Sequence, residues 1–215
     1  MDLNEALYTT RAMRRVSSDP IPADVVQSML DAAIRSPSGG NTQNWRWLTV
    51  TDRATVNELG VLYSEAWVEL NATFYKGVKE AATERGDDTT LRVISSSQWL
   101  ADNFDQVPLV VLPYHRSDPS GASIYPAVWS LMLAARGHGV GTTLTTLLGM
   151  FKQAEVAELL GVPSDKGWQN AAAIPCGYPL GRWGVAKRAP VHEVVYEERW
   201  GETPEWTVSE PLWEA

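Results

Sequence analysis

Cysteine is almost absent from the 215-residue sequence. The single residue, Cys176, excludes an internal disulfide framework and fits a protein of the reducing cytoplasm. It lies in an apolar stretch, which is typical of a small core residue rather than of a nucleophile.

Long apolar runs and an excess of positive charge are also missing. The longest apolar runs, such as residues 127–135, are too short and too interrupted to span a bilayer, and the acidic N-terminus lacks the apolar region of a signal peptide. A net charge of −8 argues against nucleic acid or an anionic membrane as a partner. We therefore expect a cytoplasmic protein that binds neither.

The common catalytic motifs are missing as well. The three histidines are scattered, none has the spacing of a metal site, and no metal ligand is predicted. There is no G-x-S-x-G nucleophile motif and no Walker A sequence, and the glycines at 137–141 do not fit the dinucleotide fingerprint. Such a chain either uses the chemistry of a bound cofactor or is not an enzyme.

Helical and extended patterns alternate along the chain. Apolar spacing predicts helices over residues 2–9, 23–35, 89–104, 124–136 and 152–160, and a long helix that begins at Asp52 as its N-cap and continues towards residue 82. β-Branched and apolar runs predict strands over residues 45–50, 108–113 and 170–178, and a strand or extended loop over 142–147. The length indicates one domain over residues 1–215, in which short β runs are separated by long amphipathic helices that would cover a sheet in layers.

Residues 36–45, SPSGGNTQNW, are the most unusual stretch, because small and amide residues separate an amphipathic helix from an apolar strand. Glycine lets a backbone approach a ligand closely, and Asn41 and Gln43 each offer donors and an acceptor. The loop would match a flat heterocycle with carbonyl and ring-nitrogen edges. A plain helix-to-strand connection is the alternative.

The five-residue stretch 11–15 holds three arginines, Arg11, Arg14 and Arg15, although the protein as a whole is acidic. The planar guanidinium is well suited to phosphate, so the cluster indicates an anion site. An exposed basic turn is the alternative interpretation.

Four segments together resemble the FMN-dependent nitroreductase family, in the family's order and over nearly the whole chain. Residues 10–16, TRAMRRV, resemble its R-[RH]-S-x-[RK]-x-F element. Residues 36–45 resemble its A-P-S-x-x-N-x-Q-P-W loop, which is the most specific of the four. Residues 139–147 resemble the segment along the flavin ring, and residues 174–179 with 188–191 resemble the closing strand and the phosphate-binding arginine.

The resemblance implies a fold and an assembly. The expected fold is α+β, with a mixed, mostly antiparallel sheet covered by helices. Two chains are expected to intertwine as a homodimer, with each flavin at the interface. The tail, about residues 203–215, is rich in proline, glutamate and tryptophan and would then pack on the partner subunit.

The resemblance also implies a chemistry, a ping-pong oxidoreductase in which NADH or NADPH reduces FMN and a small-molecule acceptor then reoxidises it. Arg14 would tune the flavin, while Arg11 and Arg188 would hold its phosphate. A backbone N–H near Thr146 or Leu147 would meet flavin N5. The expected cofactor-binding residues are Arg11, Ala12, Arg14, Pro37, Ser38, Gly39, Asn41, Gln43, Leu144, Thr145, Thr146, Leu147 and Arg188.

The sequence departs from the family pattern at three positions. Thr10 and Ala12 stand where many members have arginine and serine, which removes two phosphate donors, and Asn44 replaces the usual proline. The leading function is reduction of nitroaromatics, quinones or similar acceptors. The alternatives are a specialised biosynthetic or dehalogenating flavin enzyme and a flavin-binding storage or sensor protein with little turnover. The sequence does not identify the acceptor or choose between NADH and NADPH.

Overall fold

The computed structural model describes residues 1–213, so the end of the predicted tail, residues 214–215, lies outside the described residues. The chain divides into two compact units, one formed by Ala12–Gly181 and the other by Met1–Arg11 with Arg182–Ala215. The expectation of one domain over the whole chain stays a prediction.

The larger unit is built on an antiparallel sheet. Its strands lie in the order β1 (Trp45–Val50), β2 (Leu109–His115), β5 (Ile174–Gly177) and β3 (Gly141–Thr142), and β4 (Gln169–Asn170) pairs with the end of β2. Every strand pairing within residues 1–213 is antiparallel. The predicted α+β architecture with a mostly antiparallel sheet is therefore confirmed.

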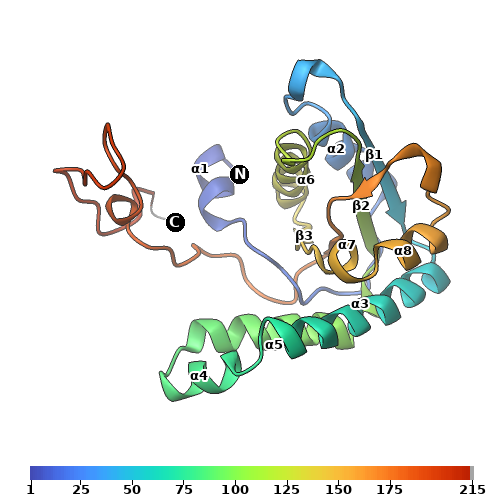
Figure 1. Cartoon of the computed structure of the whole chain (residues 1–215), viewed down its shortest axis with the longest axis horizontal. Coiled ribbons are helices and arrows are strands. Elements are labelled where there is room, and N and C mark those ends of the chain that lie inside the picture. Colours follow the sequence, from blue (N-terminus) through green and yellow to red (C-terminus); the bar gives the residue numbers. More distant parts are fainter. Residues whose placement is uncertain (214–215) are drawn as a thin grey trace. The chain divides into compact units, whose positions relative to one another are not determined.

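The central strand β2 is buried on both faces, and its side chains alternate between two cores. Leu109 and Val111 pack with helices α2 (Ala23–Ala33) and α6 (Ile124–Gly137). Val110 and Leu112 pack on the opposite face, against α3 (Arg53–Thr73) and α5 (Asp88–Asp102). Figure 1 shows the paired helices α2 and α6 beside the sheet, with α3 and α5 along another side.

The long predicted helix is two helices in the structure. Asp52 caps α3 as predicted, since its carboxylate accepts the Thr55 N–H at 2.9 Å. The helix ends at Thr73, however, and α4 (Val78–Glu84) begins after Gly77, whose φ of +77° is left-handed and incompatible with a continuous helix. The prediction that one helix continues towards residue 82 is wrong at this glycine.

The expected strand or extended loop over residues 142–147 is a strand at Thr142 and a loop with a bridge between Thr145 and Ala173, and only its last residue differs, because α7 (Leu147–Phe151) begins there. One extended prediction is corrected. The predicted strand over residues 170–178 is divided between β4 and β5 by residues 171–173. Each of these elements is too short for a periodic pattern to identify.

The remaining elements are short. Helix α8 (Gln153–Leu159) follows α7, and single 3₁₀ turns occur at Gly39–Asn41, Phe104–Gln106 and Ser164–Lys166. The smaller unit holds α1 (Leu3–Thr9) and the turn Val191–Glu193. Within residues 1–213 no helix is both long and apolar enough to cross a membrane.

Aromatic side chains order the C-terminal part of the smaller unit. The rings of Tyr196 and Trp200 meet edge to face at 5.1 Å, and the Trp206 indole N–H donates to the Glu197 carboxylate at 2.6 Å. Trp200 nevertheless remains 92% exposed. Residues 196–206, which lead into the predicted tail, are thus folded on themselves and keep the large apolar side chain of Trp200 at the surface.

Candidate functional site

The arginine segment, residues 12–17 with Arg14 and Arg15, crosses the ends of β3 and β5. The Met13 N–H donates to the Thr142 carbonyl at 2.8 Å, and the Ser17 N–H donates to the Tyr178 carbonyl at the same distance. Val16, between them, forms a bridge with Pro179. These bonds fix the backbone on both sides of Arg14 and Arg15.

Two glycines make this crossing possible. A Cβ at Gly141 would lie 2.7 Å from the Met13 Cβ, and a Cβ at Gly177 would lie 2.7 Å from the Val16 Cβ. Real Cβ atoms do not approach so closely, so the segment lies flush on the strand ends only because both positions lack a side chain.

Arg14 points into a desolvated site between helices. Its guanidinium donates to the Ser96 hydroxyl on α5 at 3.3 Å. Burial lowers the pKa of Arg14, and the nearby Tyr63 and Tyr75 phenols oppose this effect. Arg14 is partly buried, and within residues 1–213 no carboxylate forms an ion pair with it, so its positive charge is partly desolvated without a counter-charge, which is costly.

Tyr63 connects Arg14 to the segment predicted to contact the flavin. Its hydroxyl donates to the Thr145 hydroxyl at 3.4 Å, and burial raises the pKa of the phenol. Both side chains are buried. Arg14 and Thr145, which lie far apart in the sequence, are therefore neighbours of one tyrosine on α3.

The sequence analysis did not identify Tyr63 as a site residue. It lies on the apolar face of a helix, where a tyrosine is most often a core residue. The available signal was its hydroxyl, because a buried phenol needs a hydrogen-bond partner and so points to a polar site beneath the helix.

Side chains at residues 143–145 alternate between buried and exposed, and the next two are partly buried. Thr143 and Thr145 are buried and Leu144 is 39% exposed, while Thr146 and Leu147 are partly buried. The Thr143 hydroxyl has no hydrogen-bond partner among the described residues. This stretch therefore offers an apolar contact at Leu144 and a buried hydroxyl next to it.

The amide loop has the special backbone geometry that its composition predicts. Gly40, Asn41 and Gln43 have φ angles of +57°, +53° and +49°, in the left-handed region that asparagine and glycine tolerate best. The Gln43 side-chain amide donates to the Asn41 side-chain oxygen at 3.1 Å, and the Gln43 N–H donates to the Ser38 hydroxyl at 3.2 Å. Both amide side chains and the nearby Pro37 are exposed. Hydrogen bonds within residues 38–43 hold the shape of the loop.

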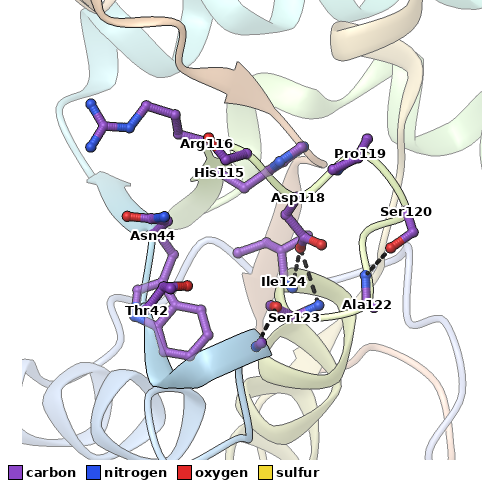
Figure 2. A pocket seen from close by; sticks show the side chains of 13 residues that line it. Thr42, Asn44, His115, Arg116, Asp118, Pro119, Ser120, Ala122, Ser123 and Ile124 are labelled. Atoms are coloured by element: carbon purple, nitrogen blue, oxygen red, sulfur yellow. Dashed lines mark hydrogen bonds between the residues drawn. The ribbon is translucent and has the colours of Figure 1, made fainter.

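A cavity of about 380 Å³ adjoins this loop (Figure 2). It lies between Gly39, Thr42 and Asn44 on one side and residues 115–124 on the other. The Gly39 N–H donates to the Ser123 hydroxyl at 3.2 Å, and the Asp118 carboxylate accepts the Ile124 N–H at 2.9 Å at the start of α6. The first bond attaches the amide loop to the N-cap residue of α6, and the second closes the turn between Asp118 and the start of that helix.

The structure separates the predicted site residues into groups. The amide loop meets the end of β2, where the Arg116 N–H donates to the Asn44 carbonyl at 3.0 Å. Val16 lies near Pro108 at the start of β2, because both flank Gly177. Seven strand residues at about 3.3 Å each span about 20 Å, so the loop and the arginine segment lie at opposite ends of one strand.

The two predicted phosphate ligands belong to the smaller unit. The Arg11 guanidinium donates to the Arg182 carbonyl at 3.1 Å, and that of Arg188 donates to the Lys187 carbonyl at 2.9 Å. Both side chains are exposed, and both have neutral partners. Ala12 is exposed and brings no donor, while the Thr10 hydroxyl is buried without a partner in residues 1–213.

The sequence profile of the family described as "Nitroreductase family" matches residues 7–178. The chain belongs to the nitroreductase family. The match includes the arginine segment, the amide loop and residues 139–147, so the resemblance drawn from these motifs is confirmed, together with the oxidoreductase class that it implies.

The chain is similar to relatives that are named for two different activities. It is 28% identical to an NADH dehydrogenase of Thermus thermophilus, over 91% of this chain and 95% of that protein. It is 26% identical to iodotyrosine deiodinase 1 of Rattus norvegicus, over 81% of this chain but only 61% of that protein. The chain therefore spans less than two thirds of the deiodinase.

A solved structure confirms the fold. Oxidised iodotyrosine deiodinase bound to FMN and 3-iodo-L-tyrosine superposes with a TM-score of 0.70 at 22% identity, covering 87% of this chain and 95% of that one. At this identity the likeness shows the nitroreductase fold alone.

Proposed function

We propose that this protein is an FMN-dependent oxidoreductase that takes electrons from NADH or NADPH and reduces a small-molecule acceptor of the nitroaromatic or quinone type. The observation that carries the proposal is the partly buried Arg14 guanidinium, which has no counter-charge within residues 1–213. An anionic ligand beside it would offset the cost of that partly desolvated charge.

The residues present fit FMN. The hydrogen bonds described within residues 1–213 for the guanidinium groups of Arg11, Arg14 and Arg188 all go to neutral oxygens, so each of these charges is available to an anionic ligand. Leu144, which is exposed just after β3, provides an apolar contact for the ring, and the buried Thr143 hydroxyl next to it has no partner within residues 1–213. These features support a flat ligand with one strongly anionic end.

Each group would then have a distinct role. Arg11 and Arg188 would hold the phosphate. Residues 144–147 would contact the ring. Asn41 and Gln43 would bond its polar edge or the ribityl chain, and Ser38 would bond the nearby backbone or the phosphate. Bound FMN would supply two-electron redox chemistry, while the protein supplies position and electrostatic field. Arg14 would stabilise negative charge on the ring by a charge-assisted hydrogen bond.

The separation of the amide loop from Arg14 supports a homodimer. Their attachment points lie about 20 Å apart along β2, and the exposed amides of Asn41 and Gln43 bond to each other. A second copy related by two-fold symmetry would bring its loop to the first copy's Arg14, so that each site takes residues from both chains. The tail, about residues 203–215, would also pack on the partner, together with the exposed Trp200 that precedes it.

Mixing two impaired variants tests the shared site. One carries Arg14→Met and the other carries Asn41→Ala with Gln43→Ala. Co-refolding should restore activity to about one quarter of the wild-type value, because half of randomly mixed dimers are hybrids and each hybrid has one intact site. No recovery in hybrids that are isolated with two affinity tags would mean that each site is formed within one chain.

A test of the chemistry uses purified protein and defined acceptors. We expect a yellow protein that releases FMN on denaturation and oxidises NADH or NADPH faster when menadione or a nitroarene is added. A colourless protein that does not take up FMN would contradict the proposal. An FMN-loaded protein that no nicotinamide reduces would instead support a storage or sensor role.

Dehalogenation is the second candidate, and the similarity to iodotyrosine deiodinases favours it specifically. Anaerobic incubation of the dithionite-reduced protein with 3-iodotyrosine separates the two activities. Release of iodide at a rate above that of nitroarene reduction would make the dehalogenating function the better assignment.

A further inference from the structure

A second cavity, of about 460 Å³, lies between the end of α3, α4 and α5. One stripe of α5 forms its floor, because Leu91, Gln98 and Asp102 recur at helical spacing and all line it. Tyr75 and Trp99 add aromatic surface. We call this cavity the α5 groove.

The α5 groove carries an excess of available positive charge. Arg15 and Lys79 line it, and no ion pair within residues 1–213 involves either of them. The only described hydrogen bond of the Arg15 guanidinium is to the neutral Ser95 hydroxyl, at 3.2 Å. The protein as a whole has a net charge of −8, so this pair of cations runs against the general charge of the surface.

The one acid of the groove is engaged by a neighbour. The Gln98 amide donates to the Asp102 carboxylate at 2.8 Å, and the Gln98 oxygen accepts the Trp67 indole N–H at 2.8 Å. This chain of bonds fixes the floor and occupies an oxygen of Asp102. The two cations at the groove keep their donors for a ligand.

The α5 groove adjoins Arg14. Tyr75, which lines the groove, lies close enough to Arg14 to act on its pKa. The two arginines also bond neighbouring residues of α5, because the Ser95 hydroxyl accepts a hydrogen bond from Arg15 and the Ser96 hydroxyl accepts one from Arg14. A ligand in the groove would therefore lie beside the arginine to which we assign the tuning of the flavin.

We propose that the α5 groove binds the electron acceptor, and that this acceptor is an aromatic carboxylate. Its ring lies on Tyr75 and Trp99, its carboxylate bonds Arg15 and Lys79, and its reducible group extends towards Arg14. This assignment rests on the proposed function, because it names the class of acceptor that the same site reduces.

The test compares two acceptors that differ in one charge, 4-nitrobenzoate and its methyl ester. In wild-type protein the acid should have the lower KM. Arg15→Gln with Lys79→Gln should raise the KM for 4-nitrobenzoate about tenfold or more and leave the KM for the ester within about twofold, because only the acid loses charge-assisted hydrogen bonds. Lys76→Gln and Arg85→Gln, which change exposed cations outside the groove lining, are the matched controls.

Three results would overturn the assignment. They are equal KM values for acid and ester in the wild type, an equal rise for both in the double variant, and a rise confined to the KM for NADPH. The last result would identify the two cations as contacts for the nucleotide phosphate.

Equilibrium binding separates failure of this assignment from failure of the proposed function. Nitroaromatics quench indole fluorescence, so 4-nitrobenzoate should quench the wild-type protein saturably, and the Arg15→Gln, Lys79→Gln variant should need about tenfold more ligand. Trp99→Phe should remove most of the quenching. Charge-dependent binding without turnover would support the groove and refute the reductase, whereas turnover without charge-dependent binding would refute the groove alone.

Discussion

Replacing Arg14 by methionine is the most informative single change, because it removes the buried charge and keeps much of the side-chain volume. If Arg14 stabilises the reduced ring more than the oxidised ring, its loss should make the flavin midpoint potential more negative. A hydrogen bond to a charged group contributes about 1.5–3 kcal/mol. For a two-electron couple this corresponds to a shift of about 30–65 mV.

The structure also predicts the sign of a second effect. Arg14 is partly desolvated, and its one described hydrogen bond within residues 1–213 goes to the Ser96 hydroxyl, so the apo-protein bears the cost of a charge without a counter-charge. Arg14→Met should therefore leave the free energy of unfolding of the apo-protein unchanged or raise it by up to about 1 kcal/mol. A merely structural arginine would lower both the stability and the FMN content of the variant.

The assay is potentiometric titration of FMN-loaded protein, with urea unfolding of the apo-protein beside it. Arg15→Met is the control, because Arg15 is exposed and bonds a different serine, Ser95. It should not move the potential. Stopped-flow reduction by NADPH should slow up to about tenfold in Arg14→Met for each 1.4 kcal/mol that the transition state loses. An unshifted potential in loaded Arg14→Met would refute the reasoning.

Three further changes test other parts of the structure. Arg188→Ala should weaken FMN binding by about 1.5–3 kcal/mol, with Arg11→Ala acting in the same direction, and unchanged affinity in both would place the phosphate elsewhere. Gly141→Ala should cost about 1–3 kcal/mol in urea unfolding, since its Cβ would lie 2.7 Å from the Met13 Cβ, whereas Gly181→Ala, in open space, should cost much less. Burial raises the pKa of Tyr114 to about 12, so the folded state holds its proton longer than the unfolded chain and stability should fall as pH rises from about 10 to 12. Tyr114→Phe should flatten that fall, because its hydroxyl has no partner within residues 1–213, and an equal slope in both proteins would contradict the assignment.

The elements that the sequence predicted well are those with long, regular patterns. The predicted helix over residues 124–136 and strand over residues 45–50 match α6 and β1 closely, because one bears a continuous apolar face and the other a compact run bounded by a loop. The break at Gly77 was missed because apolar spacing resumes after it. One glycine in the left-handed region outweighs several residues of helical pattern.

The candidate site was predictable only where a motif carried it. The amide loop and the arginine cluster stand out by composition, but the partnership of Arg14 with Tyr63 and Ser96 depends on how α3 and α5 pack. No local pattern fixes which two helices meet over a segment that precedes them by tens of residues. The α5 groove was missed for the same reason, since its cations come from a strand-like segment and from α4.

The close packing of residues 13–16 on Gly141 and Gly177 also sets when this segment can fold during synthesis. Met13 and Val16 pair with Thr142 and Pro179, so the segment that bears the arginines cannot dock until about 160 further residues have left the ribosome. At about 5–20 residues per second, synthesis keeps this stretch unpaired for roughly 8–30 s. Its charged side chains keep it hydrated during that wait. The arginine segment is thus among the first parts synthesised and among the last to fold, so a chain truncated before Pro179 should leave it open to proteases.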